Sequence, residues 1–573
     1  MAAPNEASAR HLELQSSHTA SEEPTDGTRS APGARVRLRI VREGGLVLVL
    51  LAVLFAAHAA SAHVAPGPFI PIDLGTLGGG AAGRFAAASW AAAMSSKSQV
   101  VGSSYIPDLD TAHAFSWTQA GGMIDLGTLG GSSSFAVAVS DGGQVVGSSY
   151  SAGGEVHAFS WTEAGGMIDL GTFGGFFTSP SAVNASGQVV GRSELTVPMQ
   201  ATHAFSWTQA GGMIDLGTLG GSSSFAGAVN ATGKAVGWSW ISPNEALAHA
   251  FSWTQVGGMI DLGTLGGSSS FAVAVNASGQ VVGTSQTPRN AEHAFLSTQT
   301  GGMIDLGTLG GSSSFAVAVN DNGQVIGYSA AAGDLRTHAF SWTQTGGMID
   351  LGALGGSYSE AVAVNASGQV VGYSYVAGDN SAHAFSWTQT GEMIDLGTLG
   401  GSWSFAVGVN ATGQVVGYST VPGEVPHAVL WQPIANLGCH GKHGDDDRAR
   451  RRQDDNDAEG GHGATLADCD LRGANLAGAH LSGADLSGSN LKHANLARAN
   501  LERADLTEVN LKKADLTGAN LTGAIFAGAN VKGVTWSHLR GALVRSRSRR
   551  QPGGRSSLGS DPPRDCWRRP TSW

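Results

Sequence analysis

The strongest constraint on this fold is a unit of 44 to 46 residues that occurs eight times between residues 70 and 438. Each unit carries the word His-Ala-Phe, or His-Ala-Val in the last unit, together with the word Asp-Leu-Gly. A period of 40–50 residues is typical of propellers and solenoids, because one unit alone cannot bury its apolar face. The histidines are His113, His157, His203, His249, His293, His338, His383 and His427, and the aspartates are Asp73, Asp125, Asp169, Asp215, Asp261, Asp305, Asp350 and Asp395.

Each unit contains four short segments with the composition of β-strands. HAFSW is followed by the turn-forming TQAGG and then by MIDLGTL. After GGSSS comes FAVAV, which alternates with period two, and a turn such as NASG leads into QVVGYS. Such alternation between turn sequences predicts antiparallel strands. Four strands per unit of this length predict the blade of a β-propeller.

The two ends of the repeat region predict a closed ring. The first unit begins near Phe69 with FIPIDLGTLGG and lacks a preceding His-Ala-Phe, whereas the last unit ends in HAVLWQPIANLG. The first and last blades can therefore share strands and hide the open edges that would otherwise promote aggregation. We expect an all-β, eight-repeat, β-propeller-like ring, with seven, eight or nine blades left open.

The words HAFSW, DLGTLGG and NASGQVVG resemble the HAF repeat, a family of probable extracellular repeats. The resemblance covers nearly all of residues 70–438. It implies export and repetition, and it brings no common activity and no catalytic residues.

The repeated histidine and aspartate are interpreted as structural. His113 and Asp125 lie 12 residues apart, an interval that recurs in seven units. A hairpin turn near Gln119 would place the two side chains on one face and Phe115 opposite Met123. A catalytic centre needs a few groups that break the symmetry in one cleft, and a pair in every blade does not provide that. The tryptophan of HAFSW is expected to pack between blades.

Candidate ligand-binding residues are those at which the units differ. Phe176, Phe177, Tyr358 and Trp403 occupy the loop that is SSS in other units. Aromatic rings at one loop level could line a pocket at the rim for a sugar or a peptide, and the alternative is sequence drift with the rings folded onto neighbouring strands.

Five Asn-X-Ser/Thr sequons share one hairpin turn, where asparagine and glycine would serve a positive φ. Glycosylation is therefore not expected at these asparagines. They are Asn184, Asn230, Asn276, Asn365 and Asn410.

A different period begins after a charged segment at residues 439–463, which is expected to be a solvated linker. From Leu466 to Leu521, twelve leucines recur every five residues. Neither a helix nor a strand can bury them all, but a square coil with five residues per side can. The words ANLAG and ADLSG closely resemble the pentapeptide-repeat family, which implies a short right-handed quadrilateral β-helix. Mimicry of DNA, known for some members, is disfavoured because Lys492, Lys512 and other basic residues mix with the acids.

The N-terminal region predicts export. Four arginines between Arg35 and Arg42 precede the apolar run from Leu46 to Ala57, and the small-residue sequence ASA follows it. This order is typical of a secretory signal peptide, with His63 as the first mature residue. The alternative is an uncleaved N-terminal membrane anchor. Whether the true start lies downstream of Met1 stays open.

These patterns predict five regions: an N-terminal extension and signal peptide at 1–62, a propeller-like domain at 63–438, a charged linker at 439–463, a pentapeptide β-helix at 464–538 and a disordered basic tail, of unknown role, at 539–573. The net charge of −11 argues against nucleic acid as a partner. We expect a periplasmic or extracellular, non-catalytic scaffold that binds a protein or a glycan. We expect no cofactor, no metal site and no stable membrane span after signal cleavage. The alternative is a propeller-type hydrolase or lyase with its active site in the central channel.

Overall fold

The computed structural model describes residues 69–78, 88–106, 111–196, 201–243, 247–298, 301–389, 391–437 and 466–539. The predicted signal peptide and charged linker, and the predicted tail beyond residue 539, lie outside these ranges. Within them the chain is all-β, apart from the single 3₁₀ turn η1 (Ile434–Leu437). None of the helical segments in the described ranges has the length and hydropathy to cross a bilayer.

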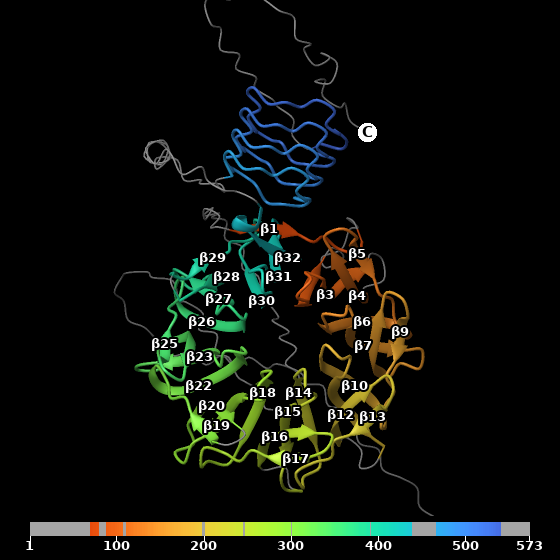
Figure 1. The fold of residues 1–573 in the computed structure, drawn as a ribbon, viewed down its shortest axis with the longest axis vertical. Coiled ribbons are helices and arrows are strands. Elements are labelled where there is room, and N and C mark those ends of the chain that lie inside the picture. The colour runs from red at the N-terminus through yellow and green to blue at the C-terminus, as the bar shows by residue number, and fades with distance from the viewer. Residues whose placement is uncertain are drawn as a thin grey trace, which may run out of the picture. The chain divides into compact units, whose positions relative to one another are not determined.

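Thirty-two described strands form eight four-stranded antiparallel blades around one axis (Figure 1). The innermost strand of each blade contacts the innermost strands of its two neighbours. These inner strands are β2 (Ser89–Met94), β6 (Gly130–Val139), β10 (Gly174–Val183), β14 (Ser224–Val229), β18 (Ser270–Val275), β22 (Gly310–Val319), β26 (Gly355–Val364) and β30 (Ser404–Val409).

The second and third strands of the blades carry the words QVVGYS and HAFSW. The second strands are β3 (Val100–Ile106), β7 (Val145–Ser151), β11 (Val189–Leu195), β15 (Ala235–Trp240), β19 (Val281–Gln286), β23 (Val325–Ala331), β27 (Val370–Val376) and β31 (Val415–Val421). The third strands are β4 (Thr111–Thr118), β8 (Val156–Thr162), β12 (Thr202–Thr208), β16 (Ala248–Thr254), β20 (Glu292–Thr298), β24 (Thr337–Thr343), β28 (Ala382–Trp387) and β32 (Val425–Pro433).

The outermost strands carry the word MID and form the circumference of the ring. Seven of them follow their third strands along the chain, and the eighth, β1, comes from the N-terminal end of the described propeller. They are β5 (Gly122–Asp125), β9 (Gly166–Asp169), β13 (Gly212–Asp215), β17 (Gly258–Asp261), β21 (Gly302–Asp305), β25 (Gly347–Asp350), β29 (Ile394–Asp395) and β1 (Phe69–Asp73).

The ring closes because β1 completes the last blade. It pairs antiparallel with β32 from Phe69 opposite Pro433 to Asp73 opposite Val429, in a sheet of order β1-β32-β31-β30. This confirms that the first and last units share strands, and it sets the blade number at eight.

The hairpin between the third and outer strands has a different register from the predicted one. Phe115 lies opposite Asp125, and Trp117 lies opposite Met123. The turn is wider than expected: Thr118 pairs with Gly122 across three residues, whereas Phe115 opposite Met123 would have left only one residue between the strands. The φ of Gly122 is 68°, which suits glycine. The expectation that Phe115 lies opposite Met123 was therefore wrong by two residues. A shift of two keeps each side chain on its face, so Phe115, Met123 and Asp125 still share one.

The core lies between blades. Val190 and Ala204 of the third blade pack against Ala235, Phe251 and Trp253 of the fourth. Phe251 is fully buried, and burying a side chain of this size contributes roughly 1.5–3 kcal/mol. The prediction that the HAFSW tryptophan packs between blades is confirmed.

The asparagines of the inner turns link neighbouring blades. The amide of Asn276 donates to the backbone carbonyl of Asn320 at 3.0 Å, and Asn230 donates in the same way to Asn276. The positive φ belongs to the turn glycine, for example Gly279 at 84°, and these asparagines do not adopt it. The expectation of a positive φ at the asparagine was wrong, because its side chain serves as a bridge between blades.

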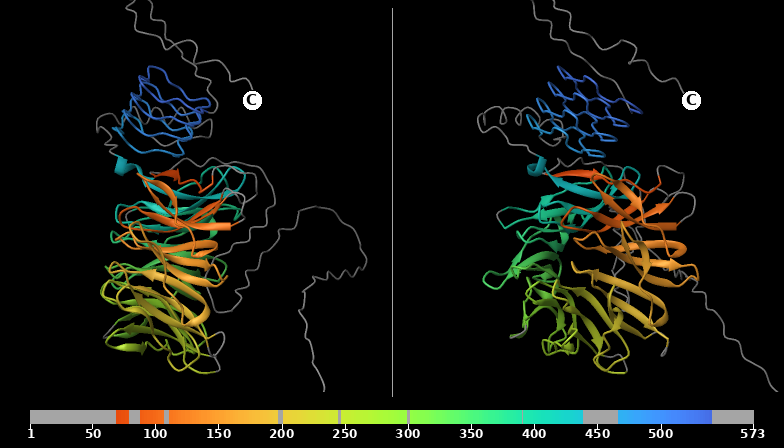
Figure 2. Two further views of the ribbon diagram at one scale, coloured as in Figure 1. Left: turned by 90° about the vertical axis from the view of Figure 1, so that its right-hand side faces the viewer. Right: turned by 45° about the vertical axis from the view of Figure 1, so that its right-hand side comes forward.

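Residues 466–539 form a quadrilateral β-helix, drawn as stacked blue coils in Figure 2. Residues twenty apart form parallel bridges, such as Asn490 with Asn510, so four pentapeptides complete one coil. Leu486 and Ala484, two residues before it, are both fully buried. The square coil with leucine and a small residue pointing inward is confirmed.

Candidate functional site

The repeated histidine and aspartate form the same contact in every blade. In all eight pairs the imidazole Nδ1 lies 2.7–2.9 Å from the carboxylate Oδ2. The carboxylate also accepts the backbone N–H two residues on, as in Asp261 with Gly263 at 2.7 Å. The pair thus ties the start of a third strand to the end of an outer strand. Because eight equivalent pairs break no symmetry, we assign them a structural role.

One of these pairs joins the two ends of the propeller. His427 of β32 lies 2.9 Å from Asp73 of β1, across 354 residues of sequence. Burial opposes ionisation of Asp73, but the hydrogen bond and charge of His427 and the N–H of Gly75 hold the pKa of this carboxyl below its usual value. The same balance holds the pKa of Asp215 low, beside His203.

The four predicted rim residues occupy one loop level but not one cluster. Phe177 and Tyr358 lie near the start of inner strands β10 and β26, and Trp403 takes the equivalent position just before β30. All three side chains are half-buried. Tyr358 and Trp403 belong to adjacent blades, and both contact the ring of Tyr375. Phe177 lies four blades from Tyr358, and Phe176 is 70% exposed. The structure therefore brings together two of the four.

Tyr358 and Trp403 are part of a continuous set of six rings, which we call the aromatic arc. Tyr373 lies 5.0 Å from Phe405 between ring centroids, and Trp403 stacks on Phe405 with an interplanar angle of 1°. All six rings are half-buried, so that each keeps an accessible part. The arc comprises Tyr358, Tyr373, Tyr375, Trp403, Phe405 and Tyr418.

A single carboxylate is held within the arc. Glu360 stands where most other blades have phenylalanine, and its Oε2 accepts the hydroxyls of Tyr358 at 2.8 Å and Tyr373 at 2.7 Å. Burial and the charge of Glu360 raise the pKa of both tyrosines far above the usual value, so both hydroxyls remain protonated donors. Oε1 accepts no hydrogen bond from the described residues and remains accessible to solvent.

Sequence reasoning missed the role of Glu360 and of the two tyrosines on β27. The signal was available in the alternation of Tyr373 and Tyr375 on the strand that pairs with β26. This alternation alone does not identify a site, because the strand register is needed to place Glu360 opposite Tyr373.

A second symmetry-breaking group lies on the opposite side of the ring. The guanidinium of Arg192 lies 5.2 Å from the ring centroid of Phe177 and 5.7 Å from that of Phe225. Burial lowers the pKa of Arg192. Its Nε is buried without a partner among the described residues. Blades three and seven are four apart in a ring of eight, so Arg192 and Glu360 do not form a pair.

The other end of the axis offers a hollow of about 340 Å³, formed by the inner turns of blades four to seven. Its asparagine amides are already committed to neighbouring carbonyls, as for Asn276 and Asn320. No group of three His, Cys, Asp or Glu side chains that could hold a metal ion occurs in the described ranges.

The β-helix matches a known family. Residues 464–503 and 499–535 match the model for pentapeptide repeats, in eight copies. Among solved structures, a pentapeptide repeat protein from the cyanobacterium Cyanothece 51142 is 32% identical over 15% of this chain and 58% of its own, with a TM-score of 0.14. No curated protein sequence matches.

The propeller is similar to peptidase propellers at low identity. The β-propeller domain of the Trilobed protease from Pyrococcus furiosus, which has an open velcro topology, is 9% identical over 50% of this chain and 91% of its own, with a TM-score of 0.35. The acylaminoacyl peptidase of Pyrococcus horikoshii is 9% identical over 58% of each chain, also with a TM-score of 0.35. This chain therefore spans less than two-thirds of the length of that peptidase and of the cyanobacterial protein.

Proposed function

We propose that this protein is an exported, non-catalytic scaffold whose propeller binds a glycan at the aromatic arc. The observation that carries the proposal is the fixed carboxylate of Glu360 among half-buried rings. Aromatic faces stack on the apolar faces of sugars, and a carboxylate with a free oxygen accepts sugar hydroxyls. A protein ligand is the second candidate, because aromatic side chains are also enriched in protein interfaces.

A hydrolase or lyase has less support. Glycoside hydrolysis generally uses two carboxylates that flank the scissile bond. Glu360 is the one carboxylate in hydrogen-bond contact with the arc among the described residues, and its partners are neutral tyrosines. The similarity to peptidases concerns propellers at 9% identity, and it carries no residue of a catalytic centre to this chain.

The binding proposal is tested by restoring serine at the arc. The double variant Tyr358→Ser/Trp403→Ser recreates the loop of the other units, and Phe176→Ser/Phe177→Ser makes the matched change in the third blade. Against a glycan array and an array of secreted proteins, we expect the first variant to bind its ligand at least about tenfold more weakly, because buried aromatic anchors often contribute 2 kcal/mol or more. The second variant should bind like the parent.

Three outcomes decide the binding proposal. Unchanged affinity of the arc variant would refute it. A large fall in its melting temperature would show that the rings are core. A hit on the protein array alone would replace the glycan by a protein.

Export rests on the Arg-flanked apolar run, the following ASA and the resemblance to HAF repeats. N-terminal sequencing of the periplasmic or cell-free fraction should give a chain that begins at or near His63. A full-length chain retained in membranes would favour the N-terminal anchor instead.

A further inference from the structure

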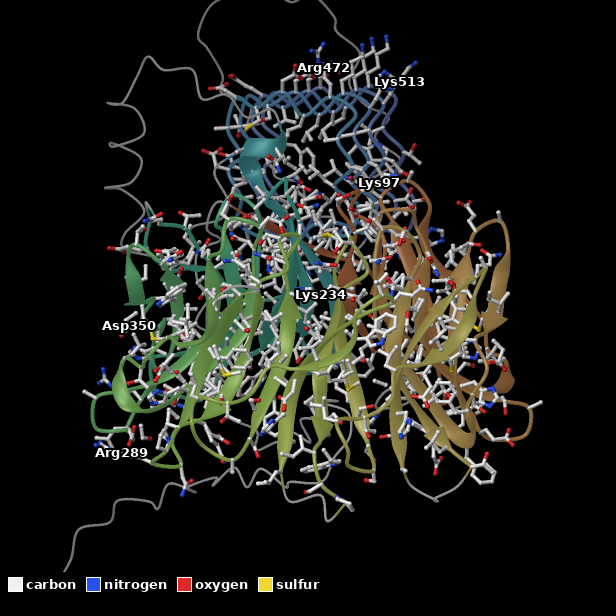
Figure 3. The ribbon with its side chains drawn as sticks, turned by 60° about the horizontal axis from the view of Figure 1, so that its bottom comes forward. Lys97, Lys234, Arg289, Asp350, Arg472 and Lys513 are labelled. Atoms are coloured by element: carbon white, nitrogen blue, oxygen red, sulfur yellow. The ribbon has the colours of Figure 1, made fainter. Side chains whose placement is uncertain are left out.

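The β-helix gathers basic side chains at one corner. Because each coil takes twenty residues, side chains twenty positions apart stack in a column, and one column is basic in all four coils. Figure 3 shows two members, Arg472 and Lys513, extending outward from the same edge. The basic corner consists of Arg472, Lys492, His493, Lys512, Lys513 and Lys532.

Backbone hydrogen bonds keep this corner in register from coil to coil. The N–H of Gly473 donates to the carbonyl of Lys492, that of His493 to Lys512, and that of Lys513 to Lys532, each at 3.0 Å. Successive cations are therefore separated by one coil, about 4.8 Å, the spacing of neighbouring strands.

An asparagine ladder supports the corner from the adjoining side. The amide of Asn510 donates to the Oδ1 of Asn490 at 3.0 Å, and Asn530 donates to Asn510 at 3.2 Å. Each asparagine precedes a corner lysine by two residues and accepts its backbone N–H, as in Asn510 with Lys512 at 3.3 Å. The corner is thus a rigid line of attachment points for flexible cationic side chains.

The charge of the corner is almost unopposed. Arg472 pairs with Asp470 at 2.7 Å, whereas within the described residues the four corner lysines have no carboxylate within 4.0 Å. Like charges that face each other on neighbouring strands destabilise a sheet. A bound polyanion would relieve this repulsion.

We propose that the basic corner binds a linear acidic polysaccharide with one carboxylate per sugar residue, lying along the β-helix axis. One extended 1,4-linked pyranose residue is close in length to one coil, so successive carboxylates would meet successive cations. A strand of duplex DNA carries one phosphate per about 3.4 Å of helix axis, a rise that falls out of step with the coils. Lysine, a point charge on a flexible stem, suits carboxylates that need no bidentate geometry. The proposal does not depend on the aromatic arc.

The test uses the full chain and polygalacturonate at low ionic strength. The double variant Lys492→Gln/Lys512→Gln should bind about tenfold more weakly and with a flatter salt dependence, because two ionic contacts are lost. The matched control Arg498→Gln/Arg503→Gln removes the same charge from other corners and should change the affinity less than about twofold. Tyr358→Ser/Trp403→Ser should bind like the parent, which separates this site from the arc.

Fully methyl-esterified polygalacturonate, which lacks the charge, should not bind. Any of the following would overturn the proposal: no binding by the parent, equal weakening by the two charge variants, or equal binding of the esterified polymer. Tighter binding of a thymidine oligonucleotide with the same dependence on Lys492 and Lys512 would assign the corner to nucleic acid instead. Melting temperatures close to that of the parent would establish that the charge variants fold.

Discussion

Among single residues, the His–Asp pairs show how solvent exposure limits the contribution of a contact to stability. His249 lies 2.8 Å from Asp261, yet 43% of the aspartate side chain is exposed. Water can therefore replace the imidazole as a partner when it is removed. The pair aligns two strands, and it is not a deeply buried ion pair.

The variant His249→Ala should lower the free energy of unfolding by about 0.5–1.5 kcal/mol, the usual net value of one hydrogen bond. Chemical denaturation measures the change. Ligand binding should persist wherever the variant is folded. Lost binding with unchanged stability would contradict the structural role.

Burial of tyrosine hydroxyls in the arc predicts a pH dependence. Burial raises the pKa of Tyr418 to about 12, from a usual value of 10.0. Because the pKa of Tyr418 is higher in the folded than in the unfolded state, its contribution to stability is fully present below pH 10. That contribution is lost as the pH rises from 10 through 12. Between pH 10 and 12, the free energy of unfolding of Tyr418→Phe should fall by roughly 2 kcal/mol less than that of the parent. Denaturation at a series of alkaline pH values tests it, and identical slopes for the two proteins would contradict it.

At the scale of elements, the inner turns act as connectors between blades. Asn276, which is 4% exposed, donates to Asn320 and accepts the backbone N–H of Gln280 at 2.9 Å. A glycan on this nitrogen would displace the bond to the next blade. The sequon is thus a product of turn chemistry.

Replacing Asn276 by alanine would remove the bond to the carbonyl of Asn320, which keeps the N–H of Gly323 as a donor, and would leave the partly buried N–H of Gln280 without its acceptor. The change should cost about 1–3 kcal/mol. The control Asn322→Ala removes a bond to the carbonyl of Ala366 on the exposed side of the same kind of turn, and it should cost clearly less. Thermal melting of both variants measures the difference. Equal losses would show that the buried bond from Asn276 to the next blade contributes no more than the exposed one.

At the scale of the whole molecule, closure depends on one short strand. β1 supplies five residues, yet it pairs along its whole length with β32 and contributes Ile70 and Ile72 to the core. Without it, the last blade would lack its outer strand, and the two ends of the ring would lose their backbone pairing and keep only side-chain bonds such as that from the N–H of Ala428 to the Oγ of Ser89.

His427→Ala should therefore destabilise the protein more than His249→Ala, although both remove one equivalent imidazole. The reason is that the side chain of Asp73 is 23% exposed, against 43% for Asp261, so the carboxylate left without its imidazole at the closure is less accessible to water. Parallel denaturation of the two variants, with hydrogen exchange of β1 amides, provides the measurement. Equal destabilisation would mean that the His427–Asp73 contact adds no more to the closure, where β1 pairs with β32, than its counterpart adds within one blade.

The elements and their connection could be predicted from the sequence. The unit of about 45 residues predicted four strands per blade and a shared closing blade. The five-residue period predicted a square coil. Both features depend on spacing along the chain. The register of one hairpin and the task of the turn asparagines were misjudged, since both depend on hydrogen-bond partners that spacing does not reveal.

Which distant side chains meet could not be predicted from the sequence, because it depends on how strands and blades pack. Tyr358 and Trp403 come from adjacent blades, and Glu360 meets Tyr373 through strand register. Four basic residues that lie among acidic ones along the β-helix sequence form one column in space, because each coil returns to the same corner after twenty residues. The spacing of residues along the chain indicates the repeating unit of each domain. Which side chains become neighbours depends on how successive blades and coils stack.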